Sequence, residues 1–344
     1  MSASVKRLPE FEVARAISIV LLLIHHSGFY SLEFSGRTLQ VLSPFLEAFL
    51  LGCFFFISGY FMELSLQRSG GNVHAFLRSR LIKIYPPYLI AFALYVSVLG
   101  FGFKSKFDVA VWLAGLQFIF SPSLVKPLLT LWYVGAILLF YGVFLVLWKV
   151  APKVRSLLIV SVVVFILALI LHRTTELLDV RFFKYFFVFL TGLLLAKPNV
   201  SGGVLSGQWM MGKTVLAILG IWLFSLALRA EADPASPFYI AASYMFIASN
   251  VILLFTVVAK LEIISPWGWV IAISHASYFV YLFHRPFWKI LEGIFPVEGL
   301  QNQILFRMLP ASLTVLVVCY FLQQFYDFLL GKFKRQSRGL NSAV

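Results

Sequence analysis

The stretch Glu12–His26, EVARAISIVLLLIHH, is an apolar segment with an arginine near its start and two histidines at its end. Arg15 and His26 lie eleven residues apart, which in an α-helix is almost three whole turns and about 16 Å along the axis. Both side chains therefore share one stripe of the predicted helix, whereas His25 points about 80° away from it. Ionisable groups at such depth usually face a protein interior or a wet cavity and are functional. The alternative is that Arg15 reaches the lipid headgroups and that the histidines simply bond a neighbouring helix.

The composition of the whole chain is that of a membrane protein. Of its 344 residues, 61% are hydrophobic and only 12% are charged, whereas soluble domains average about 25% charged residues. Backbone polar groups must be satisfied inside hydrocarbon, and the apolar runs are too long and continuous for barrel strands. We therefore predict an all-α, polytopic transmembrane helix bundle that forms one domain over residues 1–344.

Ten apolar runs are long enough to be transmembrane helices. They lie at about 13–31, 45–65, 77–99, 129–149, 156–172, 182–197, 213–229, 238–258, 269–288 and 304–330. An eleventh run, 107–121, is short for a span, and we predict an interfacial or re-entrant helix there. Residues 332–344 are expected to be a disordered, basic cytoplasmic tail.

The basic residues indicate the orientation of the chain in the membrane. With both termini in the cytoplasm, sixteen basic residues, Lys6 and Arg7 among them, flank the inner ends of the spans and eleven flank the outer ends, a modest positive-inside bias. We attribute the net charge of +14 to orientation and to contact with membrane lipids, not to nucleic-acid binding. Part of it could serve a phosphate-bearing ligand.

A second cluster of ionisable residues lies in FLRSRLIKIYPPY, residues 76–88. Arg78, Arg80 and Lys83 stand at the cytoplasmic mouth of the third predicted span, and Arg80 and Lys83 share a helix face. The double proline that follows should kink or restart the helix. Clustered Arg and Lys suit phosphate recognition. An ordinary positive-inside anchor would explain the charges, but not the prolines and tyrosines beside them.

Two other stretches combine polar residues with apolar helical sequence. CFFFISGYFME, residues 53–63, contains a Ser-Gly pair that permits close helix approach, and we interpret it as a packing notch. Its Glu63, near the inner end of the span, is expected to pair with a loop cation. HASYFVYLFHRPF, residues 275–287, places His284 and Arg285 near the outer end of the ninth span. An interfacial belt of Tyr, His and Trp explains this stretch equally well.

Several common sites are missing from the sequence. It contains no Walker A, GxSxG or HExxH motif and no cysteine metal spacing, so we predict no metal site. Cys53 and Cys319 lie within apolar runs, which argues against a disulfide framework. Carboxylates are nearly absent from the predicted spans, whereas a proton-coupled transporter usually has them.

On these motifs the chain resembles the acyltransferase 3 family of integral membrane acyltransferases, which are mostly bacterial. Glu12, Arg15 and His26 match the family's first-helix pattern of an acid, an arginine and a histidine. Further matches, in the same order, are Phe55, Phe56, Ser58 and Gly59, then Arg80, Lys83, Ile84 and Pro86, then Leu131–Tyr141 and Ser277–His284. The resemblance runs through residues 10–290. The chain departs from the pattern at Glu12, Ala16 and Lys83, where Asp, Gly and Arg are usual.

The resemblance implies an enzyme that transfers an acyl group, most often acetyl, from cytoplasmic acyl-CoA to a hydroxyl of an extracytoplasmic glycan or lipid-linked sugar. Acetyl-CoA would be a donor substrate, and no cofactor would be bound permanently. The residues expected to hold the donor are Arg78, Arg80, Lys83 and Tyr85. Candidates for the acceptor side are His25, His284 and Arg285.

In this interpretation Glu12 orients Arg15, and His26 is the general base or relays the acyl group, because a neutral imidazole has a suitable unperturbed pKa. We expect one water-accessible tunnel beside the first helix to connect Arg15 with His26. The protein would lie in the bacterial cytoplasmic membrane with both termini in the cytoplasm.

Two other functions stay open from the sequence. The chain could be a transporter or flippase of a lipid-linked or anionic substrate. It could also be a membrane partner that feeds acyl groups to a separate periplasmic transferase.

Overall fold

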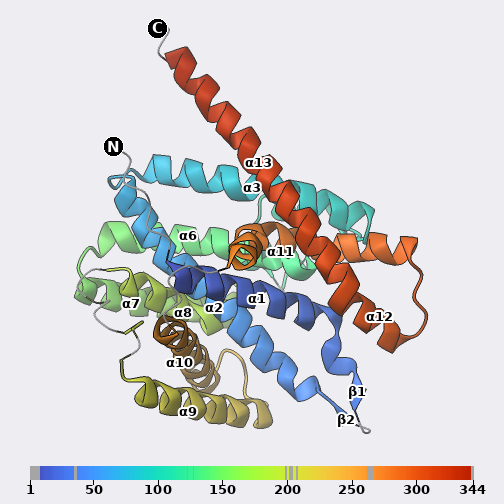
Figure 1. Cartoon of the computed structure of the whole chain (residues 1–344). Helices are drawn as coiled ribbons and strands as arrows, with labels where there is room; N and C mark the ends of the chain where they lie inside the picture. The colour runs from blue at the N-terminus through green and yellow to red at the C-terminus, as the bar shows by residue number, and fades with distance from the viewer. Residues whose placement is uncertain are drawn as a thin grey trace.

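The computed structural model describes residues 8–34, 37–121, 123–126, 128–197, 200, 204–206, 208–261 and 267–341, without the side chains of residues 34, 37 and 333–341. The described chain is a helical bundle (Figure 1). Its α-helices are α1 (Pro9–Ser27), α2 (Ser43–Arg68), α3 (Val73–Ser97), α4 (Lys106–Leu113), α5 (Gln117–Phe120), α6 (Trp132–Val150), α7 (Val154–Thr175), α8 (Arg181–Leu195), α9 (Met210–Arg229), α10 (Pro237–Lys260), α11 (Gly268–Ile294), α12 (Leu300–Phe306) and α13 (Ser312–Asn341).

Short elements join some of these helices. Single 3-10 turns lie at Phe29–Ser31, Gln40–Leu42 and Leu129–Leu131, and a π-helical turn, Arg307–Ala311, joins α12 to α13. The two-residue strands β1 (Glu33–Phe34) and β2 (Arg37–Thr38) form an antiparallel hairpin after α1, which is the only strand pairing in the described residues.

Each of the ten predicted spans coincides with a helix. Within the described chain, six helical stretches are long and apolar enough to cross a membrane, as expected of a multi-pass membrane protein: α2, α6, α7, α9, α10 and the run from α12 into α13. The remaining four are α1, α3, α8 and α11, of which α8 has only 15 residues. The other three carry the ionisable residues that the sequence analysis singled out. The all-helical membrane fold is confirmed, and the count of ten spans stays a prediction.

The eleventh apolar run is divided into α4 and α5. The break falls at Gly115, whose φ of +70° favours glycine. The eight residues of α4 rise only about 12 Å, too little to cross hydrocarbon. Its position at the membrane interface stays a prediction.

The C-terminal segment is helical as far as Asn341, because α13 continues to that residue. The expected disorder after Lys332 is therefore wrong for this part. Residues 342–344, and Lys6 and Arg7 at the other end, lie outside the described residues.

α1 lies in the middle of the bundle, where it packs against α2, α10 and α11 (Figure 1). Its buried face includes Ala14, Ser18 and Leu22. By contrast, α7 and α9 are apolar helices with little of their surface buried, and their exposed apolar side chains suit contact with lipid. The helix that carries Arg15, His25 and His26 is thus surrounded by other helices of the bundle.

The predicted packing notch in α2 is confirmed. A Cβ at Gly59 would lie 2.2 Å from the Phe189 carbonyl oxygen of α8. One at Gly192 of α8 would lie 2.1 Å from the Phe56 carbonyl oxygen. Small residues on both helices therefore permit this close approach. Near the same interface Glu63 pairs with Lys197 at 2.9 Å, the loop cation that the sequence analysis expected.

The double proline in α3 has a structural explanation. The helix is continuous from Val73 to Ser97, so the expected restart is wrong. Because Pro86 has no N–H, the Ile82 carbonyl lacks its usual partner four residues ahead. The hydroxyl of Tyr326 in α13 donates to that carbonyl instead.

The two tyrosines of the YPPY motif fix α4 in place. Tyr85 and Tyr88 donate to the carbonyls of Leu113 and Trp112, which end α4. The last carbonyls of a helix have no intrahelical partner, so these bonds satisfy them. The motif therefore positions α3 against α4, and a contact of Tyr85 with a ligand stays a prediction.

Candidate active site

Two cavities adjoin α1, and Arg15 and His26 line different ones. We call the first the arginine cavity; its volume is about 370 Å³. It lies between α1, α2, α3, α6, α11 and α13, and its polar and charged lining consists of Arg15, Ser58, Arg80, Lys83, Tyr133, Tyr141, Ser274, His275, Ser277, Tyr278, Tyr281, Gln323, Tyr326 and Asp327.

The arginine cavity has an excess of positive charge. Arg15 lies 5.7 Å from the ring of Phe61, and Arg80 donates to the Phe61 carbonyl at 3.3 Å. Neither arginine forms an ion pair with any described residue. The one acid of the lining, Asp327, instead pairs with His275 at 3.0 Å. Uncompensated guanidinium groups in a cavity suit an anionic ligand such as a phosphate.

The structure separates the residues that were predicted to hold the donor. Arg80 and Lys83 line the arginine cavity, whereas Arg78 is exposed and does not line it. Tyr85 also lies outside this lining, since its hydroxyl bonds the end of α4. The proposed donor site therefore keeps Arg80 and Lys83 and gains no support for the other two.

Glu12 and Arg15 form no ion pair among the described residues. The Glu12 carboxylate accepts a hydrogen bond from Ser274 of α11. Glu12 and Arg15 line a neighbouring cavity of about 480 Å³ between α1, α11 and α13. Glu12 thus holds α1 against α11, and its expected role in orienting Arg15 stays a prediction.

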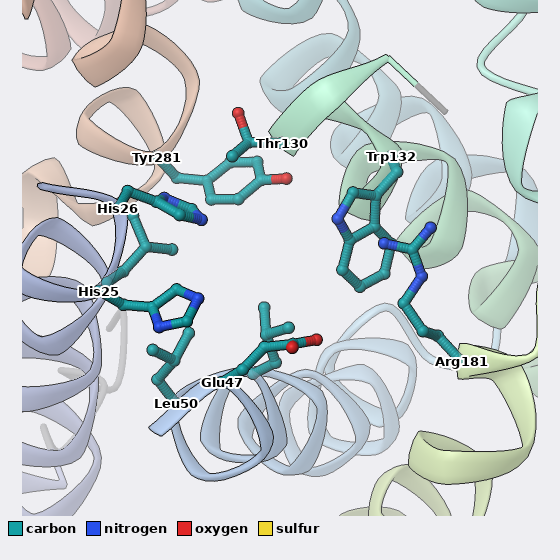
Figure 2. Close-up of a pocket in the computed structure, with 10 residues that line it drawn as sticks. His25, His26, Glu47, Leu50, Thr130, Trp132, Arg181 and Tyr281 are labelled. Atoms are coloured by element: carbon teal, nitrogen blue, oxygen red, sulfur yellow. The ribbon is translucent and has the colours of Figure 1, made fainter. Parts of the chain in front are cut away.

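The second cavity, which we call the histidine cavity, has a volume of about 220 Å³. Figure 2 shows His25 and His26 facing Trp132 and Arg181 across it, with Glu47 between the two sides. Its lining residues are Leu22, His25, His26, Glu47, Leu50, Leu51, Thr130, Trp132, Arg181 and Tyr281.

The cation of the histidine cavity is already compensated. The Arg181 guanidinium pairs with Asp179 at 2.5 Å and lies 3.7 Å from the centre of the Trp132 ring. The carboxylate of Glu47 has no ion-pair partner in the described part of the chain. This cavity therefore suits a neutral, hydroxyl-bearing ligand better than an anion.

His26 is joined to His284, which comes from α11. Nδ1 of His26 lies 2.9 Å from Nε2 of His284, and the two ring planes differ by 4°. Nδ1 of His284 lies 3.0 and 2.9 Å from the carbonyl oxygens of Val280 and Tyr281. Because carbonyls only accept, Nδ1 of a neutral His284 carries the proton, and its Nε2 accepts from Nδ1–H of His26. Nε2 of His26 is then left with a lone pair, as a general base requires.

The three residues expected on the acceptor side have different positions. His25 lines the histidine cavity together with His26, so its angle to the Arg15–His26 stripe does not remove it from this cavity. His284 is fully buried, and its Nε2 atom forms a hydrogen bond with Nδ1 of His26. Arg285 does not line the cavity, and its Nε atom is buried without a hydrogen-bond partner among the described residues.

The two cavities meet at Tyr281, which lines both of them. Arg15 and His26 therefore line two cavities that share a wall. The expected tunnel between them stays a prediction.

Five polar or aromatic residues of the histidine cavity had no role predicted from the sequence: Glu47, Thr130, Trp132, Arg181 and Tyr281. Glu47 is a carboxylate inside the predicted span 45–65, and this position is a signal for a functional site. Arg181 directly precedes the predicted span 182–197, where a basic residue also fits a charge at the membrane surface. Trp132 and Tyr281 lie within stretches that carry the family resemblance, where no role was assigned to them.

The comparison with protein families agrees with this architecture. The family model described as an acyltransferase domain, that of acyltransferase 3, matches residues 8–323, nearly the whole chain. No curated protein and no solved structure matches the chain. The chain therefore belongs to the acyltransferase 3 family and is a membrane acyltransferase.

Proposed function

We propose that the protein transfers an acyl group, acetyl in the first instance, from cytoplasmic acyl-CoA to a hydroxyl of an extracytoplasmic glycan or lipid-linked sugar. The observation that supports this most is the meeting of two unlike cavities at one residue, Tyr281. In one, Arg15 and Arg80 have no ion-pair partner among the described residues, and the other has a histidine pair. A transferase that joins an anionic donor to a neutral acceptor needs both.

The donor would enter the arginine cavity from the cytoplasm. CoA is polyanionic, and Arg80 and Lys83 on α3 would bind its phosphates by charge-assisted hydrogen bonds. The thin pantetheine arm would then pass Arg15 and bring the thioester to the wall at Tyr281. In this arrangement binding energy comes from the charged end of the donor, remote from the reacting bond.

The acceptor would occupy the histidine cavity. Nε2 of His26 would take the proton of its hydroxyl as the oxygen attacks the thioester carbon. The new C–O bond forms, the C–S bond breaks, and the proton passes to the CoA thiolate. His284 would hold the His26 ring in the required tautomer.

The test uses inside-out membrane vesicles from cells that express the protein, supplied with acetyl-labelled acetyl-CoA. We expect the label to appear in the glycan or lipid-linked sugar fraction while free CoA is released, and matched vesicles without the protein to show neither. A transporter would leave the thioester intact. A subunit that feeds a separate transferase would keep the label on the protein until that transferase is added. Either of these results would overturn the proposed function.

A further inference from the structure

Tyr281 lies in the wall that the two cavities share. It lines both the arginine cavity and the histidine cavity. On the proposed function, on which this inference rests, the thioester arrives from one cavity and the hydroxyl from the other. The carbonyl that reacts must be reached from both, so it must lie at their shared wall. In Figure 2 the Tyr281 hydroxyl points into the space that His26 also faces.

The hydroxyl of Tyr281 has no hydrogen-bond partner among the described residues, although Tyr281 is only 5% exposed. Neighbouring phenols behave differently. Tyr278 donates to the Ile84 carbonyl at 2.8 Å, and Tyr326 and Tyr88 each donate to a backbone carbonyl. A buried polar atom without a partner is costly and requires an explanation, and a catalytic role is one such explanation.

The first turn of α6 lies beside this hydroxyl. The hydroxyl lies close to the Tyr133 backbone but makes no hydrogen bond of good geometry with it. The Tyr133 ring is 5.2 Å from the Tyr281 ring, and no side chain caps the start of the helix, at Leu131. The Tyr281 O–H therefore lies beside the start of α6 and is available as a donor at the shared wall.

We propose that the Tyr281 hydroxyl donates a hydrogen bond to the oxyanion that forms during acyl transfer. When the acceptor oxygen attacks the thioester carbon, the C=O electron pair moves onto the carbonyl oxygen, and His26 holds the acceptor's proton. The Tyr281 O–H, which keeps its own proton, donates to that oxygen. As the C=O bond re-forms, the C–S bond breaks and the thiolate receives the proton from His26.

The same residue also helps to place the base. The backbone carbonyl of Tyr281 accepts from Nδ1 of His284, which in turn bonds His26. The proposed oxyanion donor and the proposed base are therefore held at fixed relative positions by one turn of α11. Fixed donors aimed at developing charge are the arrangement that stabilises acyl-transfer transition states.

The test compares Tyr281→Phe with the wild-type protein in the label-transfer assay, with acetyl-CoA as the varied substrate. We expect kcat to fall about 10²-fold, as on removal of one oxyanion donor. The KM for acetyl-CoA should change by less than about threefold, because the lost bond is made only in the transition state. Thermal unfolding of Tyr281→Phe should occur at or above the wild-type temperature, since only an unpartnered hydroxyl is removed.

Tyr185→Phe is the matched control. Its hydroxyl is also buried and unpartnered among the described residues, but Tyr185 lines neither cavity. We expect wild-type activity from it. Tyr281→Gln, which restores an N–H donor, should recover part of the activity that Tyr281→Phe loses.

A Tyr281→Phe protein that transfers label within about threefold of the wild-type rate would overturn the inference and leave the proposed function standing. Loss of activity with an equal loss of thermal stability and no recovery in Tyr281→Gln would also overturn it, because the hydroxyl would then be structural. Failure of the wild-type protein to transfer label from acetyl-CoA would instead count against the proposed function.

Discussion

The arginine cavity and the histidine cavity differ in how their charges are compensated. In the first, Arg15 and Arg80 have no ion-pair partner in the described part of the chain, whereas in the second Arg181 is paired with Asp179 and stacked on Trp132. Unpaired cations attract a polyanion, and a compensated site does not. On the proposed function, the first cavity would therefore bind the charged donor and the second would act on a neutral hydroxyl. Each prediction below changes one cavity. Substitutions in the histidine cavity should leave donor binding intact, and substitutions in the arginine cavity should act mainly on donor binding.

The largest effect is expected from His26→Ala. It removes the only general base that the proposed mechanism uses, so the rate of acyl transfer should fall by about 10²- to 10⁴-fold. CoA binding by the purified protein should persist, because the arginine cavity is unchanged. The measurement is label transfer in vesicles, together with calorimetric titration with CoA.

His74→Ala is the control for this variant. His74 is exposed, lies near the start of α3 and lines neither cavity. It should keep full activity. If folded His26→Ala turned over at the wild-type rate, His26 would have no part in the mechanism, and the division between the cavities would lose its basis.

The positions of the helices could be predicted from the sequence, because hydropathy over about 20 residues reports burial in lipid. The Arg15–His26 stripe followed from helix periodicity in the same way. The pairing of His26 with His284 did not, since these residues are 258 positions apart and local periodicity says nothing about which helices touch. The hydrogen bond between Ser274 and Glu12 could not be predicted for the same reason.

The YPPY stretch has a structural role that its local pattern does not reveal. Its tyrosines lie beside three basic residues, which favours a ligand site, yet Tyr85 and Tyr88 bond the end of α4. This role depends on where α4 packs, which the sequence of α3 does not determine. Glu47 is the opposite case, because a carboxylate inside a predicted span is a signal that could have been used.

The second largest effect is expected from Arg80→Ala, which changes the arginine cavity. A hydrogen bond to a charged group contributes about 1.5–3 kcal/mol, so kcat/KM for acetyl-CoA should fall about 10- to 150-fold, mainly through KM. Acetyl-pantetheine has no phosphates, so its transfer should be unaffected by the substitution. Arg80→Lys should have a kcat/KM for acetyl-CoA between those of the wild-type protein and Arg80→Ala, since it keeps the charge but loses the planar guanidinium.

An equal loss with acetyl-CoA and acetyl-pantetheine would contradict this assignment. Arg80 would then act through its bond to the Phe61 carbonyl, as a structural residue of α3.

His284→Ala tests the inner support of the histidine cavity. It leaves Nδ1–H of His26 without its acceptor, and an unsatisfied buried donor costs about 1–3 kcal/mol. We expect kcat to fall about tenfold with an unchanged KM for acetyl-CoA and an altered pH profile of kcat. His284→Gln, whose amide oxygen can accept from His26, should recover much of the rate. A profile identical to that of the wild-type protein would mean that His284 only fills space.

Arg78→Ala should have the smallest effect, and it fixes where the arginine cavity ends. Arg78 and Arg80 are two residues apart, which turns their side chains about 200° apart around α3. Arg78 is exposed and outside the cavity lining, and substitution of such a surface residue usually changes free energies by less than about 0.5 kcal/mol. The KM for acetyl-CoA should therefore stay within about twofold of the wild-type value, measured beside Arg80→Ala at equal ionic strength. An increase as large as that of Arg80→Ala would place the donor phosphates at the exposed mouth of α3. The arginine cavity would then hold the pantetheine arm alone, and Arg15 and Arg80 would need another anionic ligand.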